Sequence, residues 1–442
     1  MVWRISLCVL AMFVLGAAMA VAGGGREEAA EELEFEVRAP EEYSGTIVDW
    51  RHSDQAEIFR ANFMDVYPNV EVDMTIVSSN SAEYTQQVLT AVSTGANAPD
   101  MFTAWSQTIG RIVNTGYWAN LSAPPFNAEE LVGDLVPYTV DLARDAEGNI
   151  RALSWQATIG GVYYRRSMAR EYLGTDDPDE VGEMMSTVEG MLDVADTIRR
   201  ESDGDKYFMS HFSEFTPVFE SNRDVGWVDE AGNLVIDPKM HEMIDLAEIV
   251  WENDYTANVA PFSPGWYGML QDGQVFGYFL PTWGLQHVIM PNADPESAGD
   301  WAITNGPMPY ISGGTWAGIY SGSENKELAW EYLKYQIFNE EHLWDYAYNH
   351  GDYVSYIPIQ EEFAKVRQGH AYEFMGGQNV YEYFNKYRED VNHELITQYD
   401  SEFRTFWNNA IESYLTGRRS RDAAIEYFKS EVRTAYPHIN IR

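Results

Sequence analysis

The sequence predicts an α/β protein with enough chain for two lobes of ordinary domain size. The chain has 442 residues, of which 45% are hydrophobic and 22% charged, a composition typical of globular proteins with a substantial core. Its N-terminal part alternates strand patterns with helix patterns, which is the order found in a parallel sheet covered by helices. No low-complexity tract or internal repeat interrupts that order.

The first elements follow one another closely. Residues 45–50 (GTIVDW) form a short apolar strand, and Asp54 offers an N-cap for a helix whose apolar residues recur at helical spacing as far as Tyr67-Pro68. Apolar and polar side chains alternate strictly from Val70 to Ile76, which predicts a strand with one buried face. A helix over 82–94 then leads into another strand near 99–102.

The later elements are less regular. The expected extended segments are two within 147–164, one at 275–280 and one at 311–320. The expected helices lie at 176–200, around 329–337, at 401–416 and at 420–434.

The N-terminus reads as an export signal. Arg4 precedes the apolar run of residues 5–22, which ends in small residues, so residues 1–22 are predicted to be a cleaved signal peptide rather than a retained anchor. The only cysteine, Cys8, lies within this run, and none follows it, so the sequence predicts no lipid anchor, disulfide or thiolate site after cleavage. Residues 23–43 are acidic and are expected to form a flexible leader.

The charge excludes some partners. Asp and Glu number 69 against 29 Lys and Arg, a formal net charge of −40. Such a surface repels nucleic acid and anionic membranes, because binding either one needs basic side chains. A solvated acidic surface is the simpler interpretation than a specific cationic partner.

The motifs of catalysis and cofactor binding are not found. The sequence has no His-Glu-x-x-His, no phosphate-binding glycine loop and no Gly-x-Ser-x-Gly, so no catalytic residue, cofactor or metal site is predicted. Residues 145–149 resemble a calcium loop only loosely and are better explained as a turn. A glycosidase pair of carboxylates stays possible, since no pair stands out among the 69 acids.

Aromatic residues suggest a ligand. Phe, Trp and Tyr make up 14% of the chain, and aromatic rings pack well on the C–H faces of sugars. Aromatics also fill cores, so position matters. Ligands of open α/β sheets lie beyond the carboxyl ends of the strands, and five tryptophans are predicted there: Trp50, Trp105, Trp155, Trp283 and Trp316.

Five stretches in this order resemble a known family: residues 67–72 (YPNVEV), 95–101 (GANAPDM), 153–169 (LSWQATIGGVYYRRSMA), 313–319 (GGTWAGI) and 325–333 (NKELAWEYL). The chain resembles the extracellular solute-binding proteins of carbohydrate ABC transporters, the group that includes maltose-binding protein. The resemblance runs from about residue 44 to the end. The region 176–189 departs from the family pattern and suggests an inserted segment.

The resemblance implies a periplasmic-binding-protein-like fold: two α/β lobes joined by a hinge, with the ligand cleft between them. By analogy the N-terminal lobe comprises residues 44–152 plus 313–364, and the C-terminal lobe comprises 153–312 plus 365–442. It also implies a monomer without enzymatic activity, periplasmic or secreted, that captures a mono- or oligosaccharide by lobe closure and delivers it to membrane permease subunits.

The predicted ligand-binding residues combine strand ends with the analogy: Trp50, Arg51, His52, Asp54, Trp105, Trp155, Gln156, Trp283, Trp316 and Tyr353. Asp54 has a competing interpretation as a helix cap. Three other functions remain open: binding of a peptide or polyamine by the same fold, a secreted glycoside hydrolase, and, without any repeat or wall anchor to support it, a surface adhesin.

Overall fold

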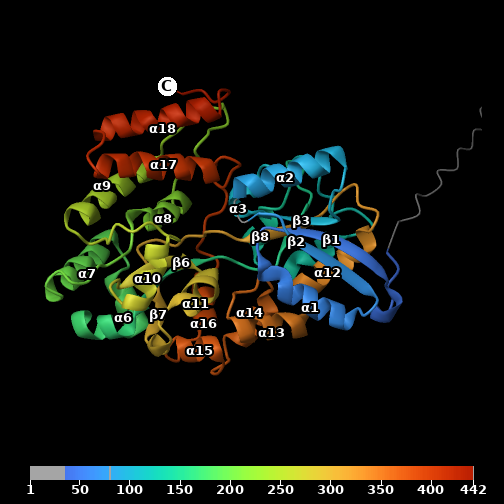
Figure 1. Ribbon diagram of the computed structural model, residues 1–442, viewed down its shortest axis with the longest axis horizontal. Helices are drawn as coiled ribbons and strands as arrows, with labels where there is room; N and C mark the ends of the chain where they lie inside the picture. The colour runs from blue at the N-terminus through green and yellow to red at the C-terminus, as the bar shows by residue number, and fades with distance from the viewer. Residues whose placement is uncertain (1–34, 79–80, 442) are drawn as a thin grey trace, which may run out of the picture.

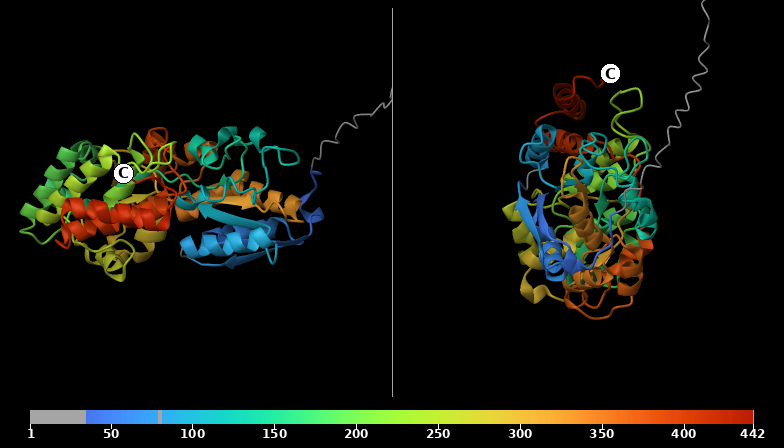
Figure 2. Two further views of the ribbon diagram at one scale, coloured as in Figure 1. Left: turned by 90° about the horizontal axis from the view of Figure 1, so that it is seen from above. Right: turned by 90° about the vertical axis from the view of Figure 1, so that its right-hand side faces the viewer.

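The computed structural model describes residues 35–78 and 81–441, which form two lobes side by side (Figures 1 and 2). The strands are β1 (Gly45–Arg51), β2 (Val70–Ile76), β3 (Met101–Trp105), β4 (Leu153–Ser154), β5 (Gly160–Arg165), β6 (Gly277–Pro281), β7 (Trp301–Thr304) and β8 (Thr315–Ile319).

The helices of the N-terminal half are α1 (Glu57–Val66), α2 (Ser81–Thr94), α3 (Ser106–Ile109), α4 (Pro137–Asp141), α5 (Arg166–Met168), α6 (Pro178–Met184), α7 (Val188–Glu201) and α8 (Thr216–Ser221). Those of the C-terminal half are α9 (Pro238–Glu252), α10 (Pro264–Asp272), α11 (Met290–Asn292), α12 (Lys326–Phe338), α13 (Glu340–His350), α14 (Ile357–Phe363), α15 (His370–Phe374), α16 (Val380–Tyr387), α17 (Asp400–Leu415) and α18 (Arg421–Ala435).

The first lobe is built on a five-stranded sheet in the order β2-β1-β3-β8-β4. Strands β1, β2 and β3 are parallel, as their alternation with helices predicts, whereas β8 arrives from the C-terminal part of the chain and runs antiparallel between β3 and β4. The sheet is therefore mixed, and its later strands could not be inferred from neighbouring sequence.

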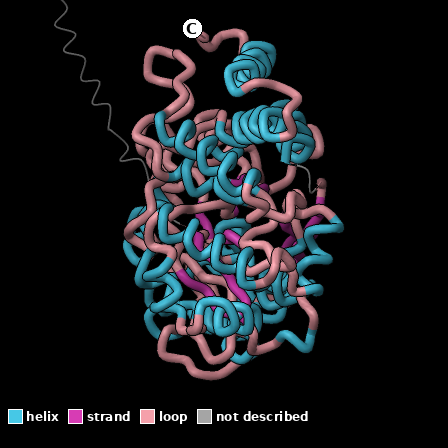
Figure 3. Tube along the Cα trace, turned by 90° about the vertical axis from the view of Figure 1, so that its left-hand side faces the viewer, coloured by secondary structure: helices cyan, strands magenta, loops and turns pink. Residues whose placement is uncertain are grey.

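The second lobe contains a small antiparallel sheet in the order β6-β5-β7. Figure 3, which faces this end of the molecule, shows helices around its strands. Helices α17 and α18 form an antiparallel layer that packs on this lobe through α9 (Figure 1). Strand β7 was not predicted, because all four of its residues are buried and lack the alternation of a half-buried strand.

The two sheets show where the chain passes between the lobes. Residues 155–159 connect β4 to β5, and residues 305–314 connect β7 to β8. Because β4 pairs with β8 in the first sheet, the predicted start of the second lobe at residue 153 is slightly too early. One hydrophobic cluster continues across this junction and includes Phe59 and Trp155 as well as Tyr163 and Tyr278.

Three local predictions need correction. Asp54 is not the N-cap: Ser53 occupies that place before a 3₁₀ turn, Asp54–Ala56, that precedes α1. The helix expected over 176–200 is two helices, because the side chain of Thr187 accepts a hydrogen bond from Gly190 N and starts α7 afresh.

The third correction concerns the leader predicted over residues 23–43. Its last part, 35–43, packs on the first lobe: the rings of Phe35 and Phe126 are 5.4 Å apart, and Tyr43 is buried. The rest of the leader to residue 34, like the predicted signal peptide 1–22, lies outside the described residues.

Candidate functional site

The N-terminal lobe presents Trp105 at the junction, at the carboxyl end of β3. The half-buried Trp105 ring lies 3.7 Å from the ring of His52, which follows β1. The two ring nitrogens of His52 make hydrogen bonds with the hydroxyls of Thr103 (3.0 Å) and Thr315 (3.4 Å). Burial, together with the neighbouring Arg51, lowers the pKa of His52 to about 3. His52 is therefore a neutral group that positions Trp105.

The C-terminal lobe presents Trp283, just after β6. Its indole Nε1 donates a hydrogen bond to Ser312 O (3.0 Å) in the segment that connects the lobes. The ring of Phe262 lies 6.2 Å from the Trp283 ring, measured between centroids. Across the same segment, Ser106 N donates to Gly314 O (3.2 Å), so the residues after β3 and β6 meet at 312–314.

A small cavity of about 30 Å³ lies at this meeting point. It is lined by Ser106 and Gln107 of the first lobe, by Ile311 and Ser312 of the connection, and by Glu220, Ser221, Arg223, Asn392, Leu395, Ile396, Asp400 and Arg404. Polar groups of both lobes thus face one space, which suits a ligand bound between them.

Four charged side chains of this lining form two ion pairs. Arg223 Nη2 lies 2.9 Å from Asp400 Oδ1, and Arg404 Nε lies 2.5 Å from Glu220 Oε2. Three of the four are buried, and Arg404 is partly exposed. The two positive charges of the arginines balance the two negative charges of the carboxylates. Within residues 35–78 and 81–441, Arg223 Nη1 has no hydrogen-bond partner. The cluster can therefore donate to an uncharged oxygen without a net charge to compensate.

The other predicted residues differ in position. Trp50 is half-buried and Asp54 exposed, both near the end of β1. The structure places the rest in the interior. Arg51 is paired with Asp49, and Trp155 packs on Phe59 with rings 5.2 Å apart.

The remaining three are also interior residues. Trp316 is buried and donates to Thr139 O (2.6 Å), and Tyr353 is buried and donates to Asn385 Oδ1 (2.7 Å). Gln156 is 2% exposed. In this conformation Arg51, Trp155, Gln156, Trp316 and Tyr353 support packing and do not face the cavity, whereas a role for Trp50, His52, Asp54, Trp105 and Trp283 stays a prediction.

Sequence reasoning missed the charged cluster and Phe262. A signal existed for Asp400 and Arg404, which are four residues apart and share a face of α17, but not for Arg223, which lies beyond the end of α8. Nothing in the local pattern marks Phe262.

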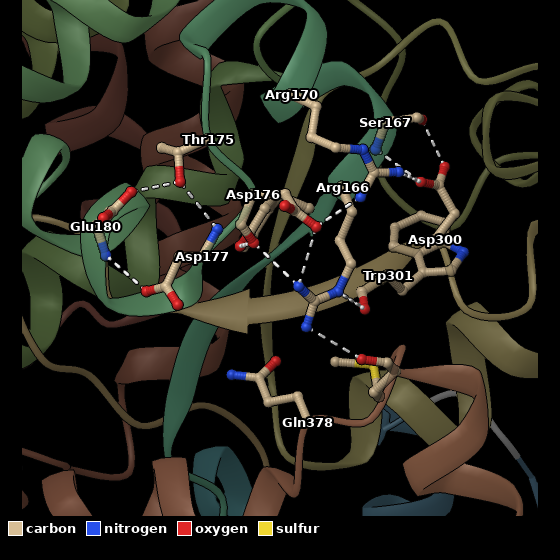
Figure 4. A network of polar contacts seen from close by, with 12 residues as sticks. Arg166, Ser167, Arg170, Thr175, Asp176, Asp177, Glu180, Asp300, Trp301 and Gln378 are labelled. Atoms are coloured by element: carbon tan, nitrogen blue, oxygen red, sulfur yellow. Dashed lines mark hydrogen bonds and ion pairs between the residues drawn. The ribbon is translucent and has the colours of Figure 1, made fainter.

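A larger cavity of about 540 Å³ lies between α6, β7 and α16, and its lining includes Asn305 at the start of the connection from β7 to β8. Arg166 at its edge is held by the protein. Its guanidinium donates to Asp176 Oδ2 (3.3 Å), Trp301 O (3.1 Å) and Met375 O (3.3 Å), as Figure 4 shows. Gln378 lines the same cavity and hydrogen-bonds both the N–H (2.8 Å) and the C=O (2.7 Å) of Ile303, which closes the edge of β7. These contacts give Arg166 and Gln378, two residues of the cavity wall, a structural role.

A buried carboxyl group supports the aromatic side of the second lobe. Glu214 accepts a hydrogen bond from Phe279 N of β6 (2.8 Å) and another from the hydroxyl of Ser210. Ser210 in turn accepts from Trp266 Nε1 of α10 (2.7 Å). Burial raises the pKa of Glu214 to about 7. The network therefore links β6, which leads to Trp283, with α10, which follows Phe262.

Residues 35–78 and 81–441 contain neither a metal-binding cluster nor a membrane-spanning helix. No set of three or more His, Cys, Asp or Glu side chains there is arranged to hold a metal ion. None of the helices in that part combines the length and apolar character needed to cross a bilayer.

Comparison with known proteins gives a matching family and solved structures of similar fold. The family model described as "Bacterial extracellular solute-binding protein" matches residues 58–372, more than half of the chain.

Three similar solved structures illustrate the fold. The galacto-N-biose-/lacto-N-biose I-binding protein of the ABC transporter from Bifidobacterium longum, in complex with lacto-N-biose, has a TM-score of 0.72 and 15% identity, covering 90% of this chain and 99% of that one. The ABC transporter associated binding protein from B. animalis subsp. lactis, in complex with β-1,6-galactobiose, has a TM-score of 0.71 and 15% identity, covering 90% and 100%. The sugar-binding protein MalE from Xanthomonas citri has a TM-score of 0.69 and 17% identity, covering 88% and 96%. The predicted two-lobed α/β fold is confirmed.

Proposed function

We propose that this chain, which belongs to the family of bacterial extracellular solute-binding proteins, captures a neutral mono- or oligosaccharide between its lobes and delivers it to the permease of an ABC importer. It would act as a monomer without turnover of the ligand, in the periplasm or secreted after signal-peptide cleavage and without a lipid anchor. The similar solved structures are two binding proteins in complex with lacto-N-biose and β-1,6-galactobiose and the sugar-binding protein MalE, which supports the carbohydrate class.

The observation that carries the ligand class is the charge balance at the lobe junction. A polyamine needs unpaired carboxylates, but Glu220 and Asp400 are each paired with an arginine. A sugar needs hydrogen-bond donors and acceptors together with apolar ring faces. The junction supplies both, through the charged cluster and through Trp105 and Trp283.

The test is a titration of the intrinsic tryptophan fluorescence of the mature protein. The ligands are lacto-N-biose, β-1,6-galactobiose, maltose, spermidine and a tripeptide. A saturable change with at least one saccharide, and recovery of that saccharide intact by chromatography, is the expected result. A response to spermidine or the tripeptide alone would replace the carbohydrate assignment, and a cleaved saccharide would indicate a hydrolase.

Replacing Trp283 with alanine is expected to weaken binding of the responding saccharide at least tenfold, about 1.4 kcal/mol, because an aromatic face of the cleft is lost. Isothermal titration calorimetry measures this without depending on a tryptophan signal. The matched control is Trp344→Ala: Trp344 lies on α13, stacked on Tyr348 with ring centroids 5.2 Å apart, and its loss should leave affinity unchanged. Equal affinities for wild type and Trp283→Ala would remove Trp283 from the site.

A further inference from the structure

The connection from β7 to β8 begins with Asn305-Gly306, the only Asn-Gly pair in the chain. In such a pair the asparagine is prone to lose its amide spontaneously, because glycine has no side chain to hinder attack by its own backbone nitrogen. Both residues are half-buried. The pair therefore places a reactive side chain at a point where the chain passes between the lobes.

Two cavities bring water to this pair. Asn305 lines the cavity of about 540 Å³ between α6, β7 and α16, and both Asn305 and Gly306 line a second cavity of about 420 Å³ together with residues 307–309. Each cavity is far larger than the roughly 30 Å³ that a water molecule occupies in the liquid. Access of water and hydroxide therefore does not limit the reaction.

Packing explains why glycine follows Asn305. A Cβ added to Gly306 would lie 3.1 Å from Phe279 Cε1 of β6, closer than an ordinary van der Waals contact. Glycine thus lets the connection run close against the second sheet. Because the fold requires the glycine, any protection of the pair must come from the contacts of Asn305.

The amide of Asn305 is held at both ends. Its Oδ1 accepts a hydrogen bond from the hydroxyl of Tyr387 on α16 (3.1 Å), and its Nδ2 donates to Gly182 O on α6 (3.1 Å) and to the adjacent Gly306 O (3.3 Å). Gly182 permits this approach of α6, because a Cβ there would overlap Asn305 Oδ1. Loss of the amide requires the side chain to turn until Cγ meets Gly306 N, and these hydrogen bonds oppose that turn.

The reaction has two steps. Gly306 N gives its proton to hydroxide and attacks Asn305 Cγ, the Cγ–Nδ2 bond breaks, and ammonia leaves with a proton from water, which closes a succinimide ring. Water then adds to either ring carbonyl and opens the ring to aspartate or isoaspartate, releasing a proton to solvent. A carboxylate accepts hydrogen bonds but does not donate them, so the bond to Gly182 O is lost. Isoaspartate also adds an extra backbone carbon to the connection.

We propose that Asn305 is a deamidation site in the connection between the lobes, that Tyr387 and Gly182 hold its amide in a conformation that slows the reaction, and that conversion releases the connection from α6. The protein thus ages by a defined chemical step at the junction of its lobes. This inference does not depend on the class of ligand.

The test compares Tyr387→Phe with Tyr383→Phe, each of which removes a hydroxyl from α16. Tyr383 is the matched control, since its hydroxyl donates to Gly160 O (3.2 Å) and not to Asn305. During incubation at mildly alkaline pH, Tyr387→Phe is expected to form aspartate and isoaspartate at residue 305 about fivefold faster than wild type or Tyr383→Phe, the factor given by the net strength of an ordinary hydrogen bond. Peptide mapping by mass spectrometry measures the conversion of every asparagine in the same sample.

Three outcomes would overturn the proposal. Equal conversion at residue 305 in wild type and Tyr387→Phe would remove the protection by Tyr387. No conversion in folded Tyr387→Phe, while the same protein converts in urea, would remove the site. Faster conversion of asparagines throughout Tyr387→Phe would show that the hydroxyl acts through general stability and not on Asn305.

The effect of conversion is measured with Asn305→Asp. Loss of the hydrogen bond to Gly182 O is expected to lower the thermal midpoint by about 2 °C. The matched control is Asn258→Asp, which adds the same charge at an exposed position whose φ of +57° suits aspartate as well as asparagine, and which should melt like wild type. Equal midpoints for the two variants would refute the release of the connection from α6.

Discussion

Replacing Arg51 with alanine is expected to lower the free energy of unfolding by about 3–5 kcal/mol, because it leaves a buried carboxylate without its counter-ion. Arg51 Nε lies 2.7 Å from Asp49 Oδ2, and their side chains are 2% and 0% exposed. Arg51 Nη2 also donates to Gln336 Oε1 of α12 (3.2 Å), so the pair fixes the helix on the sheet. Urea denaturation followed by circular dichroism measures the loss.

The control for this prediction is Arg60→Ala. Arg60 pairs with Glu57 on the surface of α1, where the two side chains are 28% and 51% exposed. Exposed pairs contribute about 0–1 kcal/mol, so this variant should remain close to wild type. A similar loss in both variants would contradict the buried-pair argument. The double variant Asp49→Leu with Arg51→Met should recover much of the stability, because it removes both charges and keeps the volume.

The second large effect concerns Glu214 and pH. Burial raises the pKa of its carboxyl from 4.5 to about 7 in the folded protein. Between these values the folded state holds a proton that the unfolded state has released, so stability is fully present below about pH 4.5 and falls as pH rises through 7. At pH 8 the ionised group costs about 3 kcal/mol.

Glu214→Gln removes this titration while keeping a group that can accept from Phe279 N and donate to Ser210. The unfolding free energy of the variant relative to wild type is therefore expected to rise by about 3 kcal/mol between pH 4 and pH 8. Thermal unfolding across this range measures it. The exposed Glu230→Gln removes the same charge and should show no such rise, which separates the buried group from the general repulsion of an acidic protein. A flat difference for Glu214→Gln would show that the carboxyl does not titrate near neutrality.

Sequence patterns predicted the elements whose burial is one-sided. The alternation from Val70 to Ile76 identified β2, because one face of that strand is covered and the other is not. The same reasoning fails for β7, which is covered on both faces, and for the break before α7, where one hydroxyl decides the start of a helix. The mixed order of the first sheet depends on β8, which is distant in sequence.

For the candidate site residues, the sequence predicted the position relative to the strands better than the direction of the side chains. Trp105 and Trp283 follow strands at the junction, but Trp155 and Trp316, placed by the same argument, point into the core. The rule that ligands lie beyond the carboxyl ends of strands locates the backbone but does not give the direction of a side chain. That direction reverses from one residue of a strand to the next, as it does between Trp50 and Arg51. Phe262 could not be found, because its exposure and its position beside Trp283 are properties of the folded chain.

The size of the junction cavity has a kinetic consequence. A volume of about 30 Å³ holds roughly two water molecules, far less than a sugar ring. If the saccharide binds at the charged cluster, as proposed, it can enter only after the lobes have separated, and the opening step precedes binding. At high saccharide concentration the observed association rate would then stop increasing and become equal to the rate of opening, a property of the hinge that is the same for every sugar the protein accepts.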